Sequence, residues 1–189
     1  ASADRLLFRR GNFNGTMDEV ICDALCRQLD AEIALSPGFR WGTTVLSGQP
    51  ITMGDILSQT AMTYPEVYVQ PMSGEQIKVV LEDICDNLFN LDPYYQQGGD
   101  MVRIGGMSYT CAPNEATGKR ISDMKLGGVA LDPAKSYKVA SWASVNEQKG
   151  APVWETVASY LRDGKSKPKA GSQVKIVGVD DNPGFAGQT

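Results

Sequence analysis

Apolar residues recur at helical spacing in two separate stretches of this chain, and short strand-like runs lie between and after them. The first stretch predicts a helix over about residues 17–30, with an apolar face made of Met17, Val20, Ile21, Ala24, Leu25 and Leu29. The second predicts a helix after Ser73, with an apolar face made of Ile77, Val80, Leu81, Ile84 and Leu88. Each helix has one face to bury, so we expect the strands to form a sheet that these faces cover.

The remaining elements do not follow the regular strand–helix–strand order of a parallel sheet. Short apolar or alternating runs predict strands over residues 32–35, 64–70, 101–104, 107–111, 121–126, 137–142 and 174–179. Two further helices are expected over 53–60 and 151–161, the latter with Pro152 in its first turn. This order predicts an α+β fold in which a mixed sheet packs with helices. With 189 residues, 42% of them hydrophobic, the chain fits one domain over residues 1–180 and a tail over 181–189.

Three of the expected helices begin with the capping-box pattern. In this pattern a Ser or Thr side chain and a polar side chain three residues later each bond the other's backbone N–H. The pairs are Thr16 with Glu19, Thr52 with Asp55, and Ser73 with Gln76. Each pair predicts the residue at which its helix begins.

The chain contains no histidine, and this absence excludes more kinds of catalytic site than any other feature of the composition. The commonest general base, the commonest metal ligand and the Ser-His and Cys-His nucleophile systems are all excluded with it. The net charge of −4 gives no basic field for nucleic acid, and no apolar run approaches the roughly 20 residues that span a bilayer. We therefore expect neither a nucleic-acid partner nor a membrane segment.

The four cysteines show no C-x-x-C spacing, so the sequence does not predict a zinc knuckle or a redox pair. Cys22 and Cys26 lie on one face of the first helix and are interpreted as small core residues. The sequence does not decide whether Cys85 and Cys111 form a disulfide, because sequence alone does not give the distance between them. The acidic residues of the two main helices are interpreted as solvated faces; they are Asp18, Glu19, Asp23, Glu82, Asp83 and Asp86.

One loop stands out as a candidate ligand contact. Pro37 and Gly38 end the strand 32–35, and Arg40 then follows between Phe39 and Trp41. A guanidinium in this setting is a permanently charged fork for an anion. The competing interpretation is an ordinary loop in which the two aromatic residues anchor the chain and Arg40 faces water.

A second loop, over residues 90–100, is rich in amides, tyrosines and glycines. Gly98, Gly99 and Asp100 could form an anion-binding nest, and Arg103 in the following strand is a second candidate anion contact. Tyr94 and Tyr95 precede them. The sequence thus offers groups that hold a ligand but no catalytic residues, as expected of a substrate-recognition domain from a larger enzyme.

Over roughly residues 10–180 the chain resembles the C-terminal domain of the 5′-nucleotidase family. The strings that carry this resemblance are Ser36-Pro37-Gly38-Phe39-Arg40, Gly48-Gln49-Pro50-Ile51-Thr52-Met53-Gly54-Asp55, Met72-Ser73-Gly74-Glu75-Gln76-Ile77-Lys78 and Gly118-Lys119-Arg120. The resemblance implies an N-terminal metallophosphoesterase domain, absent from this chain, that holds two metal ions. The domain seen here would close over that site and supply substrate-binding arginines and aromatics.

Longer strings are similar to the thiosulfohydrolase branch of this family, which serves the Sox sulfur-oxidation system. They are Arg9-Arg10-Gly11-Asn12-Phe13-Asn14-Gly15-Thr16, residues 36–42, residues 92–103 and Trp142-Ala143-Ser144-Val145-Asn146-Glu147. This resemblance implies a periplasmic enzyme with two manganese ions in the absent domain and no cofactor in this one. Its substrate would be a cysteine S-thiosulfonate on the arm of the SoxYZ carrier protein, from which it hydrolyses sulfate.

In this interpretation Arg40 contacts the sulfonate together with Arg103. Phe39, Trp41, Tyr94 and Tyr95 shape a channel for the carrier arm, and residues 98–100 form its wall. The chain departs from the nucleotidase pattern at both base-stacking positions, since Met101 replaces one aromatic and residues 146–152 lack the motif that carries the other. Two alternatives remain: a 5′-nucleotidase or cyclic phosphodiesterase domain, and a non-catalytic peptide-binding module.

Overall fold

The computed structural model describes residues 1–39, 41–145, 150–164, 173–180 and 182. Its helices are α1 (Thr16–Gln28), α2 (Met53–Thr60), α3 (Gly74–Phe89) and α4 (Val153–Arg162), with the short 3₁₀ helix η1 (Pro93–Tyr95). Its strands are β1 (Ile33–Ser36), β2 (Val67–Ser73), β3 (Arg103–Gly105), β4 (Met107–Cys111), β5 (Ile121–Leu126), β6 (Val129–Ala130), β7 (Ser136–Trp142) and β8 (Val174–Ile176).

The strands form two four-stranded sheets, each of mixed direction. The first has the order β2-β7-β1-β3, with β1 parallel to β7 and the other pairs antiparallel. The second has the order β6-β5-β4-β8, with β4 parallel to β8. The predicted α+β class is confirmed, with two mixed sheets in place of the single one expected.

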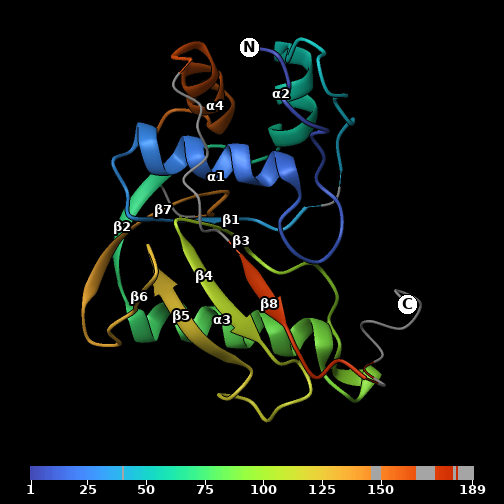
Figure 1. The fold of residues 1–189 in the computed structure, drawn as a ribbon, viewed down its shortest axis with the longest axis vertical. Coiled ribbons are helices and arrows are strands. Elements are labelled where there is room, and N and C mark those ends of the chain that lie inside the picture. The colour runs from blue at the N-terminus through green and yellow to red at the C-terminus, as the bar shows by residue number, and fades with distance from the viewer. Residues whose placement is uncertain (40, 146–149, 165–172, 181, 183–189) are drawn as a thin grey trace.

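The first sheet is covered on both faces, which explains why its central strands β1 and β7 carry apolar side chains on both sides. Along β7, Tyr137 and Val139 face one hydrophobic core with α3 and the second sheet, whereas Ala140 and Trp142 face another core with α1 and α4. This alternation is the period of two that a strand imposes on its side chains. Figure 1 shows α1 lying across the first sheet, with α2 and α4 beyond it and α3 on the opposite side.

Two capping boxes form as predicted, and the third does not. Thr52 and Ser73 are the N-caps of α2 and α3, and their hydroxyls accept from the N–H groups of Asp55 and Gln76. Helix α1 instead begins after Gly15, because the Thr16 hydroxyl accepts the N–H of Phe8 from the incoming segment.

Several strand and helix limits differ from the expected ones: α1 ends at Gln28 and not at residue 30, and β8 ends at Ile176 and not at residue 179. Three other differences have a cause in the structure. Strand β2 starts at Val67 and continues through Pro71, which is tolerated because β2 is an edge strand of its sheet. Pro152 is the N-cap of α4 instead of a residue of its first turn. Strand β3 starts only at Arg103, since the N–H of Met101 donates to the carbonyl of Asn12 outside the sheet.

The predicted tail over residues 181–189 lies outside the described residues except for Asn182. That side chain is buried, and its amide donates to the carbonyl of Phe89 and to Asn114. Among the described residues, no helix is both long and apolar enough to cross a membrane.

Candidate functional site

The loop that follows β1 presents two stacked aromatic rings. The ring of Phe39 lies 3.9 Å from that of Trp41 at an interplanar angle of 19°, and it also meets Trp142 edge-on at 6.0 Å. The indole N–H of Trp142 donates to the Ser36 hydroxyl at 2.8 Å, which fixes the point where the loop leaves the sheet. Trp41 remains 42% exposed, so the loop offers an aromatic surface to a ligand. Arg40, the predicted anion contact, lies outside the described residues.

Gly38 brings this loop against the segment that leads into β3. A Cβ at Gly38 would lie 2.7 Å from the Cβ of Asp100, and closer still to the carbonyl oxygen of Met101. Only a glycine allows this approach of the two backbones. The predicted site residues Gly38, Phe39, Trp41, Asp100 and Arg103 are therefore brought together by packing, although they are far apart in sequence.

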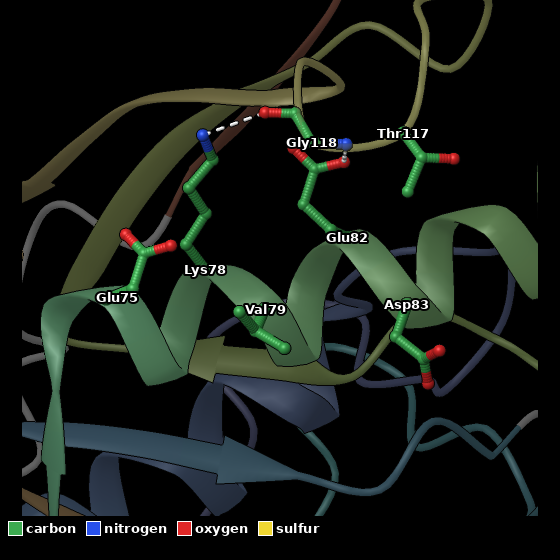
Figure 2. A pocket seen from close by; sticks show the side chains of 7 residues that line it. All are labelled: Glu75, Lys78, Val79, Glu82, Asp83, Thr117 and Gly118. Carbon is green, nitrogen blue, oxygen red and sulfur yellow. Dashed lines mark hydrogen bonds between the residues drawn. The ribbon is translucent and has the colours of Figure 1, made fainter.

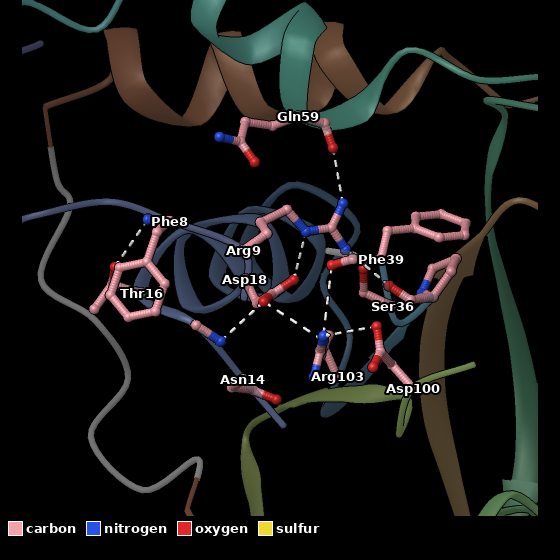
Figure 3. A network of polar contacts seen from close by, with 12 residues as sticks. Phe8, Arg9, Asn14, Thr16, Asp18, Ser36, Phe39, Gln59, Asp100 and Arg103 are labelled. Carbon is pink, nitrogen blue, oxygen red and sulfur yellow. Dashed lines mark hydrogen bonds and ion pairs between the residues drawn. The ribbon is translucent and has the colours of Figure 1, made fainter. Parts of the chain in front are cut away.

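We call the loop that carries Phe39 and Trp41 the aromatic loop. Beneath it lies a buried network of two arginines and two aspartates (Figure 3). The Nε of Arg9 donates to Asp18 at 2.6 Å, and the Nε of Arg103 lies 3.5 Å from the other oxygen of the same carboxylate. Arg103 also pairs with Asp100 at 3.5 Å. None of these side chains is more than 5% exposed.

The two guanidinium groups use their remaining N–H groups to hold backbone carbonyls. Arg9 donates to Pro37 at 2.8 Å and to Gln59 at 2.7 Å, and its guanidinium carbon lies 5.5 Å from the ring centre of Phe39. Arg103 donates to Phe13, to Gly11 at 2.8 Å and to Phe39 at 3.5 Å. The aromatic loop is thus held from below at both Pro37 and Phe39.

Burial changes the ionisation of this network. Desolvation raises the pKa of Asp18, against the attraction of Arg9 and Arg103, and desolvation lowers the pKa of Arg103. Formal charges balance within the four residues, so their mutual attraction offsets part of the cost of removing them from water. We interpret the network as a structural support that holds the aromatic loop in place.

Arg103 does not fit the predicted role of anion contact. Its guanidinium is 0% exposed and its N–H groups point at protein oxygens, so it acts on the loop from beneath. Arg9 does the same and was not among the predicted site residues, although it begins one of the strings that carry the family resemblance. The interpretation of Asp18, Asp23 and Glu82 as solvated is wrong, because all three are buried. Glu82 accepts the N–H groups of Gly118 and Ile121.

The structure sets Tyr94 and Tyr95 apart from the aromatic loop. They are 88% and 61% exposed and meet each other edge-on at 5.4 Å. Figure 1 shows their turn beyond the C-terminal end of α3, with the chain then running back toward the end of β1. Gly98 and Gly99, in that connecting segment, have positive φ, and a Cβ added at either would meet no atom of the described residues within 4 Å. The Gly98 N–H donates to the carbonyl of Asn87 at 3.4 Å, which takes that amide out of the predicted anion nest.

The described residues do not fit a metal centre, and a surface groove on α3 is mainly acidic. No three His, Cys, Asp or Glu side chains of the described part gather as metal ligands would. The groove, of about 290 Å³, lies between α3 and the turn at Thr117 and Gly118 (Figure 2). Among its described lining residues the only cation is Lys78, which donates to the carbonyl of Gly118 at 2.9 Å, and three carboxylates disfavour an anionic ligand. The aromatic loop remains the better candidate site.

Comparison with known families gives the class of this domain. The profile of the 5′-nucleotidase C-terminal domain matches residues 8–156, and the chain belongs to this family. Comparison with curated proteins gave no match.

Among solved structures, the chain is similar to the sulfate thiohydrolase SoxB of Thermus thermophilus, solved in complex with glycerol. The two share 36% identity with a TM-score of 0.85, over 94% of this chain and 35% of that protein. This finding confirms the resemblance drawn from the long sequence strings.

More distant structures share the fold. A 5′-nucleotidase precursor, also from Thermus thermophilus, is 20% identical with a TM-score of 0.70, over 94% of this chain and 39% of that one. The NAD nucleotidase of Haemophilus influenzae is 18% identical with a TM-score of 0.63, over 86% of this chain and 33% of that one. This chain thus spans roughly a third of the length of each of these enzymes.

Proposed function

We propose that this chain is the substrate-recognition domain of a periplasmic thiosulfohydrolase. The full enzyme would hydrolyse sulfate from a cysteine S-thiosulfonate carried on the C-terminal arm of a SoxYZ protein. The observation that carries the proposal is the aromatic loop after β1, held from below by buried arginines, in a domain that resembles a solved sulfate thiohydrolase. A preorganised loop of this kind positions a substrate without losing binding energy to its own ordering.

Each part of the loop has a distinct role in this proposal. The exposed ring of Trp41 packs against the carrier arm, and Phe39 holds that ring by stacking on it. Arg40 pairs with the sulfonate, whose oxygens match a guanidinium fork as phosphate oxygens do. Tyr94 and Tyr95 contact a more distant part of the carrier. Residues 98–100 lie between these tyrosines and the segment that packs against the aromatic loop.

The hydrolytic step itself belongs to another domain in this proposal. Two manganese ions in an N-terminal metallophosphoesterase domain would activate the attacking water and stabilise the negative charge that develops on the leaving group. The residues described here bind and orient the substrate.

A nucleotidase role for this domain has less support. Met101, which stands where nucleotidases carry one base-stacking aromatic, is fully buried and cannot face a nucleobase. Phe39 has Trp41 on one face and Arg9 nearby, so the two aromatic residues do not leave a slot for a base between them. Residues 146–149, at the position of the other stacking motif, lie outside the described residues. A non-catalytic peptide-binding role would be favoured if the protein that contains this domain had no metallophosphoesterase domain.

The experiment is a binding titration with the intact protein that contains this domain. A peptide with the sequence of a carrier arm, ending in cysteine S-thiosulfonate, is titrated with and without AMP, and the same peptide with a free cysteine is the control. We expect saturable binding that AMP does not displace and that the free-thiol peptide does not match. Displacement by AMP, or hydrolysis of AMP without hydrolysis of the thiosulfonate, would contradict the proposal and support a nucleotidase function.

Two variants locate the binding to the loop. Trp41→Ala is expected to weaken peptide binding by about tenfold or more, equivalent to a lost contact of about 1.4 kcal/mol. Val129→Ala removes an apolar side chain that is also exposed, on β6 of the other sheet, and is expected to leave binding unchanged. Equal affinities for the two variants would contradict the assignment.

A further inference from the structure

Two cysteines from distant parts of the chain meet in the second hydrophobic core. Cys85 lies in α3, and Cys111 is the last residue of β4. Their sulfur atoms are 3.6 Å apart, which is van der Waals contact, and both thiols are free and fully buried. A disulfide needs a sulfur–sulfur distance of about 2.05 Å, so closure requires the two sulfurs to approach by about 1.5 Å.

The surroundings of the pair favour a thiolate on one partner. The pKa of Cys85 is lowered, first by the hydrogen bond from the Cys111 thiol and then by the charge of Arg120, against burial. The pKa of Cys111 is raised by the same shared hydrogen bond and by burial. Glu82 and Asp86 on α3 oppose the thiolate, whereas the Arg120 guanidinium is held nearby by its ion pair with Asp86. Thiol–disulfide exchange begins with a thiolate, which the folded surroundings of Cys85 favour over those of Cys111.

We propose that Cys85 and Cys111 form a native disulfide that joins α3 to β4 when the protein folds in an oxidising compartment. The thiolate of one cysteine attacks one sulfur of an external disulfide, such as oxidised glutathione, and one external thiol leaves. The sulfur of the other cysteine then loses its proton, displaces the second external thiol and closes the bond. One external S–S bond is reduced to two thiols, and the two protein thiols are oxidised to one S–S bond.

The other two cysteines provide an internal contrast. Cys22 and Cys26 lie four residues apart on α1, and burial raises the pKa of Cys22 well above its ordinary value. A bond between them would constrain only a short segment that is already helical. Cys85 and Cys111 are 26 positions apart, and a bond between them closes a loop that includes η1, β3 and the segment beneath the aromatic loop.

The proposed disulfide does not require the proposed substrate role, because the two sulfurs meet inside the domain and the bond needs only an oxidising environment. Because both thiols are fully buried, exchange takes place while the chain folds or when α3 opens locally. The closed loop lowers the entropy of the unfolded chain, and the expected increase in thermal midpoint is on the order of 10 °C.

The test refolds the full chain of residues 1–189 from denaturant in glutathione buffers, one oxidising and one reducing. Titration of thiols in denaturant is expected to find four in the reduced protein and two in the oxidised protein. Proteolysis and mass spectrometry of the oxidised wild-type chain are expected to find a peptide pair linked through Cys85 and Cys111, which requires no variant to fold.

Variants and thermal unfolding complete the test. The double variant Cys22→Ala, Cys26→Ala is expected to lose its two remaining thiols on oxidation, whereas Cys85→Ala, Cys111→Ala keeps both of its own. The proposal is overturned if four thiols persist after oxidative refolding or if the mapped link joins Cys22 to Cys26. It is also overturned if the oxidised protein unfolds at a lower temperature than the reduced one, since a native bond adds stability.

Discussion

Replacing Gly38 by alanine tests whether the aromatic loop depends on its close approach to the segment before β3. The optimal separation of non-bonded carbon atoms is about 3.5–4.0 Å. An alanine Cβ at this position would lie 2.7 Å from the Cβ of Asp100, so the loop or its neighbour must move by about 1 Å. The neighbour is held, because Met101 is fully buried and its N–H donates to Asn12 at 3.1 Å.

We therefore expect the loop to move and the protein to lose stability. Added volume at a well-packed position costs about 1–3 kcal/mol. With a urea m-value of about 1–3 kcal/mol/M, the unfolding midpoint of Gly38→Ala should fall by about 1 M. The displaced loop should also bind the carrier-arm peptide about tenfold more weakly, since Phe39 and Trp41 move with it.

Gly54→Ala is the matched control for this substitution. Gly54 lies in the first turn of α2, and the one atom of the described residues within 4 Å of a Cβ there is the Thr52 hydroxyl oxygen, at an ordinary 3.5 Å. Alanine favours the helix by about 0.5–1 kcal/mol, so this variant should be slightly more stable than the wild type. If Gly38→Ala matched the wild type in both urea midpoint and peptide affinity, the argument from close approach would be refuted.

Three further predictions concern the buried network, a helix cap and the isolated domain. Arg103→Leu removes a donor from Asp100 and from three backbone carbonyls, and urea denaturation should show a loss of about 3–5 kcal/mol; a loss below about 1 kcal/mol would contradict the support role. Thr52→Ala should cost about 1 kcal/mol. The hydrogen bonds from Thr52 lower the pKa of Asp55, so this carboxylate stabilises the wild type above the unfolded pKa of 3.8 and the effect is lost as the pH falls below it. The stability difference between wild type and Thr52→Ala should therefore shrink in acid, and a constant difference would contradict the hydrogen bond that the Thr52 hydroxyl donates to the Asp55 carboxylate. Finally, the purified chain of residues 1–189 should hydrolyse neither thiosulfonate nor phosphoester, and detectable turnover by the pure domain would contradict the division of roles.

The sequence by itself determined the elements whose signals are local. Helices α2 and α3 begin where Thr52 and Ser73 predict, because a capping box uses only side chains and amides of neighbouring residues. Strands β4 and β5 coincide with the predicted ranges 107–111 and 121–126, and the aromatic loop falls where Pro37 and Gly38 end the strand before it. The family resemblance also came from contiguous strings, and the domain profile and a solved thiohydrolase support it.

Only the tertiary structure decided the partners of groups that are far apart in sequence. The polar face of its helix predicts a solvated Asp18, yet Arg9 and Arg103 arrive from two other segments and offset the cost of its burial. The sequence predicts Arg103 as an anion contact, and this prediction fails because backbone carbonyls surround its guanidinium. An arginine beside a glycine turn gives no local sign of those carbonyls. Thr16 does not act as the predicted cap because its hydroxyl accepts the N–H of Phe8, which local sequence does not place beside it.

The cysteine pair shows the same division. Sequence gives the identities of Cys85 and Cys111 and their separation along the chain, and this leaves their distance in space undetermined. Packing of α3 against the second sheet brings the two sulfurs to 3.6 Å. Local signals determine where α2 and α3 begin, because a capping box spans only a few residues. The buried contacts that hold the candidate site depend on which segments the fold brings together.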